Sequence, residues 1–293
     1  MEWERAKTYI LIFFVLLNIV LGVMLVIENR RYVMSGDHER LIRTVLNRNN
    51  ISMYTFPIRR FPPMRPLEVT GFYYDKEDLK QILFENPEDV VQEEHPWRYI
   101  FRYGNIRLEI SDGFIDYRNP YGFHQRGTAT ILSQLSNGVT GTAARRLTDI
   151  FINNHFPDFV FDGTLAGRPS EDEIRIVYRQ EYRRVLVHSN SIEFLVTPVG
   201  IVEIEMQFGQ ILGHVAEPMV IFSPDEALLA FAQRVRHITE VRPIHINRMD
   251  LVYFQGYISD QFGPYHAVPF YRIFTQCEDR PFLINAFTNV AFD

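Results

Sequence analysis

The sequence predicts an α+β protein on a single membrane anchor, and three observations support this class. Residues 10–27 form a run of eighteen residues without a charge. After this run, segments rich in β-branched and aromatic residues are separated by turn signals such as Gly104-Asn105 and Asp112-Gly113. Between them lie segments with apolar residues at helical spacing. Strands and amphipathic helices grouped in this way are typical of α+β domains.

Residues 8–27 are predicted to form the transmembrane helix. Fifteen of the eighteen residues from Ile10 to Ile27 are Leu, Ile, Val or Phe, and each favours membrane insertion by about 0.3 to 0.6 kcal/mol. The run is longer than the apolar region of a signal peptide, which has about 7 to 15 residues. No cleavage site with small residues follows it. We therefore expect an uncleaved anchor.

The segments that flank the anchor are a short tail, residues 1–7, and a polar connector, residues 28–36. Basic residues lie on both sides of the span, with Arg5 and Lys7 before it and Arg30 and Arg31 after it. The excess of basic residues that marks the cytoplasmic side is a weak guide when a long domain follows. Charge alone therefore leaves the orientation open.

The region after the connector has the composition of a folded domain, because the chain is 46 % hydrophobic and 14 % aromatic. Two similar units, each an antiparallel sheet with helices, are predicted at 37–125 and 126–293. The basis is a repeated order of one strand, one helix and three strands. The boundary is placed between residues 118 and 140, where the loop 119–127 contains Pro120, Gly122 and Gly127.

Helices are expected where apolar residues share one face and a capping residue precedes them. Asp75 and Ser223 are the clearest capping residues, and Ser223 with Glu226 matches a capping box. The prolines in residues 55–66 predict an extended loop, which carries Arg59, Arg60 and Arg65. The expected helices are 37–47, 75–84, 141–154 and 224–237, and the expected strands are 51–56, 67–73, 97–103, 106–111, 114–117, 159–165, 173–182, 192–197, 202–207, 244–257, 268–276 and 282–287.

Motifs that carry chemistry are missing from the sequence. It has no nucleophile elbow, paired-histidine zinc motif, P-loop or dinucleotide fingerprint. Cys277 is the only cysteine, the nine histidines are scattered, and a net charge of −6 argues against nucleic acid as a partner. We therefore predict no catalytic, metal or cofactor residues and expect that the protein is not an enzyme. A site assembled at long range stays open as an alternative.

One face of the predicted anchor is a candidate interaction site. Asn18 lies in the middle of the span, and Gly22 follows one turn later on the same side. Helices in lipid associate through small residues and side-chain hydrogen bonds. The alternative is a lone helix that tolerates one amide. The candidate transmembrane interaction face consists of Leu11, Phe14, Asn18, Gly22 and Leu25.

Three segments resemble the YycI family. The opening Met1-Glu2-Trp3-Glu4-Arg5-Ala6-Lys7-Thr8 is similar to that family's start, an acidic residue and Trp followed by Lys-Thr before the span. Residues 41–51, Leu-Ile-Arg-Thr-Val-Leu-Asn-Arg-Asn-Asn-Ile, resemble the family's first extracytoplasmic helix and its exit. Residues 268–273 and 282–287 resemble the closing strands that YycI shares with its sister family YycH. Thr288-Asn289-Val290 departs from the family, which often continues with Thr-Gly.

The resemblance implies a function and an orientation. YycI proteins are membrane-anchored auxiliary regulators of the WalK (YycG) sensor histidine kinase of Gram-positive bacteria, which controls cell-wall metabolism. They act with YycH through contacts between transmembrane helices and carry no catalytic residues. For this chain the resemblance implies a cytoplasmic N-terminus, a single span in the cell membrane and an extracytoplasmic domain. An anchored extracytoplasmic binding or scaffold module with another partner is the alternative.

Overall fold

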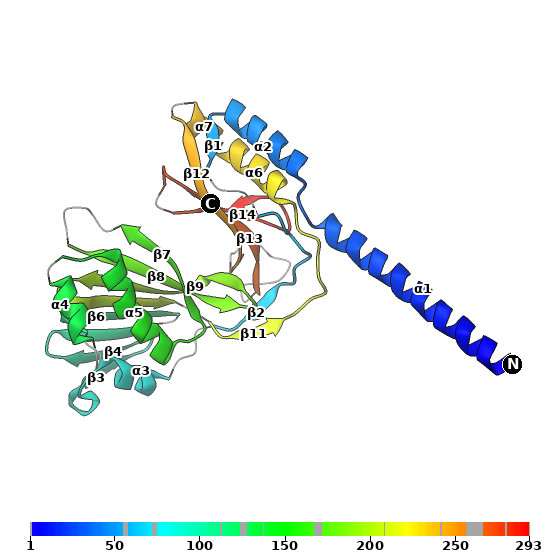
Figure 1. Ribbon diagram of the computed structural model, residues 1–293. Helices are drawn as coiled ribbons and strands as arrows, with labels where there is room; N and C mark the ends of the chain where they lie inside the picture. The colour runs from blue at the N-terminus through cyan, green and yellow to red at the C-terminus, as the bar shows by residue number, and fades with distance from the viewer. Residues whose placement is uncertain are drawn as a thin grey trace. The chain divides into compact units, whose positions relative to one another are not determined.

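The computed structural model describes residues 2–54, 58–71, 75–111, 113–123, 128–136, 138–166, 172–207, 209–240, 242–255, 266–278 and 280–292. Its helices are α1 (Glu2–Arg31), α2 (Gly36–Arg48), α3 (Lys76–Leu83), the 3₁₀ turn Pro87–Asp89, α4 (Ala129–Leu135), α5 (Gly141–His155), α6 (Pro224–Arg234) and α7 (Arg236–Thr239). Its strands are β1 (Ile51–Met53), β2 (Leu67–Val69), β3 (Val91–His95), β4 (Arg98–Tyr103), β5 (Ile106–Ser111), β6 (Phe114–Phe123), β7 (Phe159–Ala166), β8 (Ile174–Tyr182), β9 (Val185–Thr197), β10 (Gly200–Gln207), β11 (Ile211–His214), β12 (Ile244–Phe254), β13 (His266–Thr275), β14 (Phe282–Asn285) and β15 (Ala291–Phe292). The α+β class is confirmed (Figure 1).

The described part of the chain forms two compact units with boundaries other than the predicted ones. Unit 1 comprises Met1–Arg65, Glu217–Asp250 and Tyr271–Asp293, and unit 2 comprises Pro66–Ala216 and Leu251–Phe270. The division at 125/126 cannot hold in unit 2, because β6 pairs with β10 in one sheet. The second predicted repeat is also divided, since β10 belongs to unit 2 and α6 to unit 1. The predicted duplication is therefore not confirmed.

Unit 2 is built on an antiparallel sheet whose strand order is β3-β4-β5-β6-β10-β9-β8-β7. The hairpin predicted at Gly104-Asn105 joins β4 and β5, and Gly104 adopts a φ of 58°. Pro198 and Val199 turn the chain from β9 into β10. Asp112 lies outside the described residues. Strand β3 was not predicted, because its sequence VQEEH contains few residues that favour β-strands.

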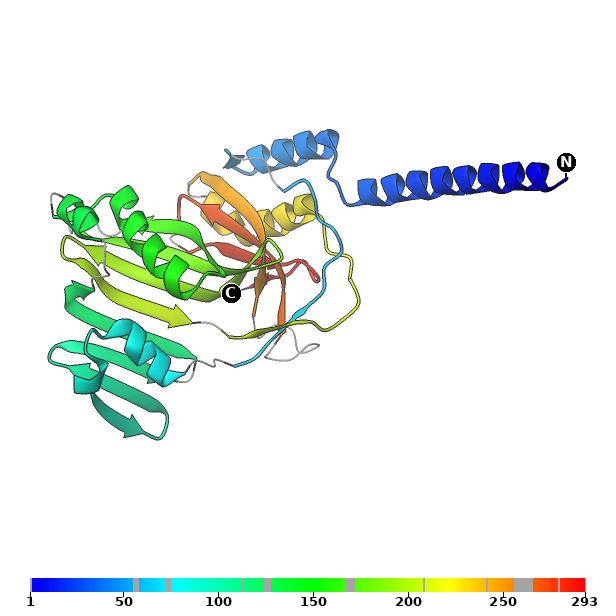
Figure 2. The same ribbon diagram turned by 60° about the horizontal axis from the view of Figure 1, so that its bottom comes forward.

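One face of this sheet carries the core of unit 2. Figures 1 and 2 show α4 and α5 over this face, and the buried Leu79 and Leu83 bring α3 into the same cluster. Phe151 of α5 lies at its centre, where its ring contacts those of Phe123 and Phe194 with centroid distances of 5.7 and 5.4 Å. Burial of such side chains stabilises the unit by about 1.5–3 kcal/mol each.

Strand β6 contains a wide bulge where the sequence predicts a loop. Phe123 lies opposite Ile201 and Arg118 opposite Glu203, so residues 119–122 of β6 match a single residue of β10. The buried Asn119 fixes the bulge: its Nδ2 donates to the Gly122 carbonyl at 3.2 Å, and its Oδ1 accepts from the Tyr121 N–H at 3.0 Å. Gly122 has a φ of 81°, which suits glycine. The glycine and proline that predict a loop are thus the residues of a bulge.

Unit 1 contains the helices α2 and α6, which contact each other. Each begins at a capped serine: Ser35 Oγ accepts from the His38 N–H at 3.3 Å, and the predicted capping box of α6 is confirmed. Strand β1 runs parallel to β12, and β14 pairs with β13 and β15. The fully buried guanidinium of Arg272 donates two 2.8 Å hydrogen bonds to Asp250. Such a bidentate pair satisfies a charge that would otherwise be costly to bury.

Candidate functional site

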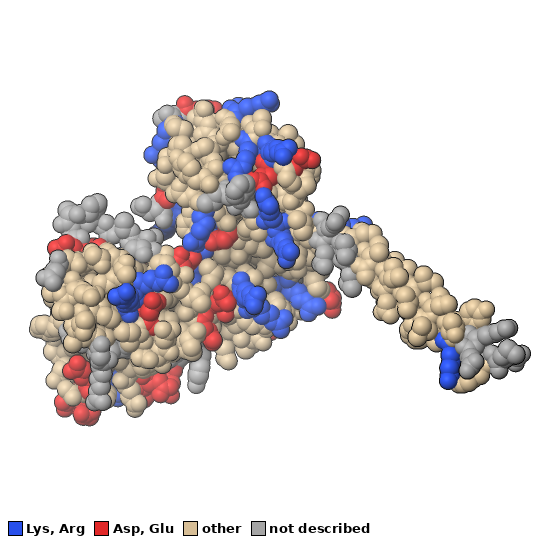
Figure 3. Space-filling model, in the orientation of Figure 1, with Lys and Arg blue, Asp and Glu red and all other residues tan. Residues whose placement is uncertain are grey.

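Helix α1 is long and apolar enough to span a membrane or to act as a signal anchor. Its window Lys7–Met24 has no buried residue. The large apolar side chains from Tyr9 to Met24 are 40 to 70 % exposed, all around the helix. In Figure 3 this stretch shows uncharged atoms only. A helix that is apolar on every side and covered by no described residue needs an apolar surrounding, which the core of a lipid bilayer provides.

Four residues of the predicted interaction face lie uncovered on the surface of α1. Leu11 is 66 % and Phe14 56 % exposed, and Asn18 and Gly22 are exposed as well. Their spacing of three or four residues places them in one row along the helix. Leu25 belongs to α1, but its side chain is outside the described part. The structure therefore brings the row together but shows no partner for it.

Asn18 finds its first hydrogen bond within its own helix. The amide Nδ2 donates to the Phe14 carbonyl oxygen at 2.8 Å. This bond lowers the free-energy cost of placing the amide in lipid. It therefore supports the alternative that α1 is a lone helix which tolerates one amide. No described residue donates to the amide oxygen. That oxygen is the part of Asn18 that a second helix could use.

No described segment packs closely against Gly22. Apart from the backbone of its own helix, no described atom would lie within 4 Å of a Cβ at this position. Its backbone is helical, so the glycine does not serve an unusual φ. A glycine inside a helix costs about 0.5–1 kcal/mol relative to alanine. The close approach of another helix would explain why a residue without a side chain occupies this position.

The connector after α1 pairs with the proline-rich loop. The Met34 N–H donates to the Arg59 carbonyl at 2.8 Å, and the Phe61 N–H donates to the Tyr32 carbonyl at 3.0 Å. Val33 and Arg60 form the antiparallel bridge between them. We call the paired segments 32–34 and 59–61 the juxtamembrane bridge. Both segments were predicted to lack regular structure, and no pattern in the sequence indicates that they pair.

A buried carboxylate holds the juxtamembrane bridge to α2. Glu39 is only 6 % exposed, and its two carboxylate oxygens lie 3.3 Å from Arg43 Nη2 and 3.2 Å from Arg59 Nη2. Arg43 also donates to the Met53 carbonyl at 3.1 Å. The three groups therefore connect the helix, the strand β1 and the loop.

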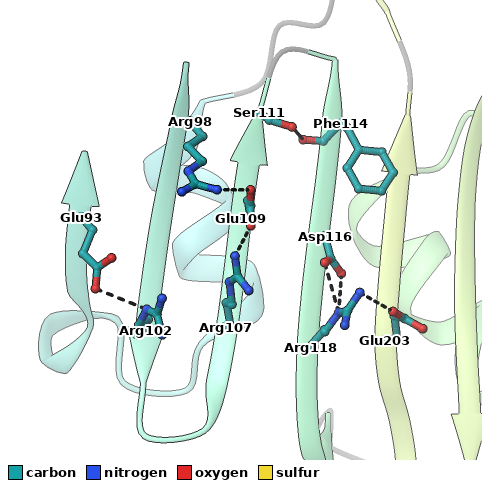
Figure 4. Close-up of polar contacts among 10 residues, drawn as sticks. All are labelled: Glu93, Arg98, Arg102, Arg107, Glu109, Ser111, Phe114, Asp116, Arg118 and Glu203. Carbon is teal, nitrogen blue, oxygen red and sulfur yellow. Dashed lines mark hydrogen bonds and ion pairs between the residues drawn. The ribbon is translucent and has the colours of Figure 1, made fainter. Parts of the chain in front are cut away.

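The second face of the unit 2 sheet is covered with ion pairs (Figure 4). Its side chains alternate along the strands with those of the core, so they lie opposite the helices. Arg118 bridges Asp116 at 3.1 Å and Glu203 at 3.3 Å. The further pairs are Arg102 with Glu93 at 3.3 Å, Arg98 with Glu109 at 3.5 Å, Arg175 with Glu203 at 3.2 Å and Arg107 with Glu109.

Four carboxylates lie side by side on this charged face. Glu109 is opposite Asp116, Asp116 opposite Glu205, and Glu205 opposite Glu193 on successive strands. Like charges in direct opposition destabilise a sheet. Burial, followed by repulsion from Glu203, raises the pKa of Glu205 above its ordinary value. The neighbouring arginines offset part of this repulsion.

The scattered histidines do not form a metal centre in the described part of the chain, where no group of three potential ligands occurs.

His245 makes a hydrogen bond through Nδ1 with Ser52 Oγ, and the Tyr54 ring stacks on the His245 ring with a centroid distance of 5.3 Å. The parallel pairing of β1 with β12 brings these residues together. This long-range pair could not be found from sequence spacing.

Comparisons with known proteins show a shared fold. No protein-family model matches this chain, and no curated protein matches it. Solved structures do match, 13 chains in number. An uncharacterized protein from Eubacterium rectale is similar at a TM-score of 0.55 and 8 % identity, over 83 % of this chain and 90 % of that one. The C-terminal domain of Bacillus megaterium YpeB aligns at a TM-score of 0.42 and 10 % identity, over 76 % of this chain and 96 % of that domain.

Proposed function

We propose that this protein is a membrane-anchored, non-enzymatic regulator of a WalK-type sensor histidine kinase, of the YycI kind. It acts with a YycH-like protein and adjusts cell-wall homeostasis in a Gram-positive bacterium. In this proposal α1 contacts the transmembrane helices of the kinase, and unit 2 and the rest of unit 1 lie outside the cell. The resemblance of the opening octet and of the closing strands to YycI supports the choice of partner.

The row of Leu11, Phe14, Asn18 and Gly22 is the observation that carries the proposal. An anchor needs only length and apolarity. This helix also contains a glycine against which no described segment packs and an amide whose oxygen no described residue uses. Both features support close contact with a second helix, where polar contacts contribute about 0.6–2 kcal/mol.

Substitutions in α1 test this contact. Asn18→Leu should weaken association with the kinase by about three- to thirtyfold, which corresponds to about 0.6–2 kcal/mol. Gly22→Ile should act sterically on the same side. Val20→Ile adds a methylene on another side and is the matched control. Association is measured with a membrane two-hybrid assay together with a kinase-dependent reporter. Equal association and equal reporter output for the three variants at matched membrane levels would mean that α1 only anchors the protein.

The orientation has its own test. With Cys277→Ser as background, single cysteines at Glu4 and Arg60 are exposed to a membrane-impermeant thiol reagent on intact protoplasts. The proposed topology expects labelling at position 60, which is exposed in the structure, and protection at position 4. Labelling at 4 with protection at 60 would reverse the topology.

An anchored binding module with another partner is the second candidate, and the charged face favours it. Glu203 is 13 % and Asp116 18 % exposed, so these charges are ordered rather than freely solvated. Alternating fixed charges can select a partner of complementary pattern. Loss of partner capture from solubilised membranes by Arg118→Gln, with full kinase association retained, would favour this candidate.

A further inference from the structure

We propose that the juxtamembrane bridge and the residue before it bind the headgroups of anionic phospholipids, with Arg60 of the bridge and the adjoining Arg31 as the contacting residues. The inference rests on the proposed function only in that α1 spans the membrane. It adds a second membrane contact, which would orient unit 1 on the bilayer surface.

The charge distribution along the chain points to this contact. Residues 28–66 contain eight arginines and three acidic residues, a net charge of +5 in a protein whose total is −6. Residues 67–293 carry −11. The basic residues are therefore concentrated in the part of the chain that directly follows the span. An anionic surface attracts such a segment within about a Debye length.

The geometry keeps the bridge near the level of the headgroups. The apolar run ends at Ile27, and α1 continues as a helix to Arg31, which adds about 6 Å at 1.5 Å per residue. The headgroup layer on each side of the hydrocarbon core is about 5–8 Å thick. Tyr32 follows directly. The bridge between Val33 and Arg60 holds the proline-rich loop within about 5 Å of this connector.

Two arginines at the bridge, Arg31 just before its first segment and Arg60 within its second, are available to bind lipid. Arg59 pairs with Glu39 at 3.2 Å, and Arg65 pairs with Glu217 at 3.6 Å. Arg31 and Arg60 are exposed and form no ion pair with a described residue. Val33 is 42 % exposed between them. A basic pair flanking an exposed apolar side chain suits the boundary between headgroups and hydrocarbon.

The aromatic pair of the bridge supports the same placement. The rings of Tyr32 and Phe61 meet edge to face with a centroid distance of 6.4 Å. Tyrosine is enriched at the membrane–water interface.

Lipid is favoured over other anions because the span holds the bridge at the bilayer permanently, which gives the lipid a high effective concentration. Two arginines near an anionic surface should increase the equilibrium constant for contact between the bridge and the lipid roughly thirtyfold.

The experiment uses the full-length chain in nanodiscs, with Cys277→Ser and a spin label at Val33→Cys. One set of discs contains phosphatidylcholine only, and the other contains 30 % phosphatidylglycerol. Collision of the label with a water-soluble nickel chelate is compared with collision with oxygen. Phosphatidylglycerol should lower the nickel accessibility severalfold. Arg31→Gln/Arg60→Gln, or 0.5 M NaCl, should abolish this protection.

Arg236→Gln is the matched control, because Arg236 is an exposed arginine on α7 whose ion pair is with Glu240, one turn later in the chain. It should keep the protection. Equal accessibility in the two kinds of disc, or protection retained in the double variant, would overturn the proposal. A second label at Leu21→Cys should report an oxygen-rich environment in every disc. A Leu21 label in water would overturn the anchor and the lipid contact together, whereas weakened kinase association in the Asn18→Leu variant does not depend on the bridge.

Discussion

Helices α1 and α5 both carry large apolar side chains, but they place these side chains in different surroundings. Both are rich in large apolar side chains, but α5 gathers them on one side, where Leu147 and Phe151 are at most 2 % exposed in the core of unit 2. On α1 the apolar side chains point in every direction, and Phe14 is 56 % exposed. The partner of α5 lies in its own chain. No described residue covers the apolar surface of α1, so this surface needs a partner outside the described part of the chain, such as lipid or another protein.

Polar residues within the two helices extend the comparison. The Thr148 hydroxyl of α5 shares its single proton between two acceptors, the Ala144 carbonyl at 3.2 Å and, at 2.8 Å, the Tyr178 hydroxyl, which donates its own proton to Asp149. Asn18 of α1 bonds the carbonyl one turn back in the same way, at 2.8 Å. Thr148 thus has a local and a tertiary partner, while Asn18 has only the local one among the described residues. In our proposal the kinase supplies the missing tertiary partner.

The largest expected effect comes from the same substitution made in each helix. Phe151→Ala should lower the free energy of unfolding by about 3–5 kcal/mol, because it leaves a cavity among the rings of Phe123 and Phe194. Phe14→Ala should leave it unchanged. Urea unfolding of the full-length protein in detergent, followed by near-ultraviolet circular dichroism, measures both. Equal destabilisation by the two variants would mean that α1 is covered by its own chain.

A smaller effect is expected at the polar positions. Thr148→Val should destabilise unit 2 by about 0.5–1.5 kcal/mol, since it removes the hydrogen bond to Tyr178 while keeping the shape. The Tyr178 hydroxyl retains its 2.6 Å bond to Asp149. In the same urea titration Asn18→Leu should have no effect, although in our proposal it weakens association with the kinase. An unchanged midpoint for Thr148→Val would show that its tertiary bond adds nothing.

The smallest effect concerns the charged face. The folded pKa of Glu205 is raised above the ordinary 4.5, mainly by burial, so the folded state binds a proton more tightly than the unfolded state. This group therefore lowers stability as the pH rises above 4.5. Glu205→Gln should be more stable than the parent at pH 7, and the difference should disappear near pH 4. Glu203→Gln is the control: it loses ion pairs to Arg118 and Arg175 and should be less stable at pH 7.

Local signals account for the elements that the sequence predicted well. Helix α3 begins after Asp75, whose Oδ1 accepts from the Glu77 N–H at 2.8 Å, and α6 begins at its predicted capping box. Turn residues such as Gly104 identify the hairpins because they act within a few residues. The row on α1 could likewise be read from helical spacing alone. These features depend on neighbours in sequence, so one sequence is enough to find them.

Long-range pairings were missed for the opposite reason. Val33 and Arg60 are bridged, and β1 pairs with β12 almost two hundred residues later. No spacing rule connects such segments. The bulge of β6 was missed for another reason. Asn119 and Gly122 are residues typical of turns, and the sequence therefore predicts a loop, but in the structure they form a bulge within a strand that continues to Phe123. The units were misplaced because the chain passes between them four times.

Those four passages have a consequence for biosynthesis. The segment beside the membrane, up to Arg65, belongs to unit 1 together with Glu217–Asp250 and Tyr271–Asp293. At about 5–20 residues per second, a ribosome needs roughly 8–34 s to add the chain from Arg65 to the end of α6. During this time Ile42 and Leu46, buried in the finished molecule, have no α6 to pack against. In our proposal α1 enters the membrane first, so the segment up to Arg65 waits for Glu217–Asp250 and Tyr271–Asp293, and a chain whose synthesis stops before β14 lacks part of unit 1.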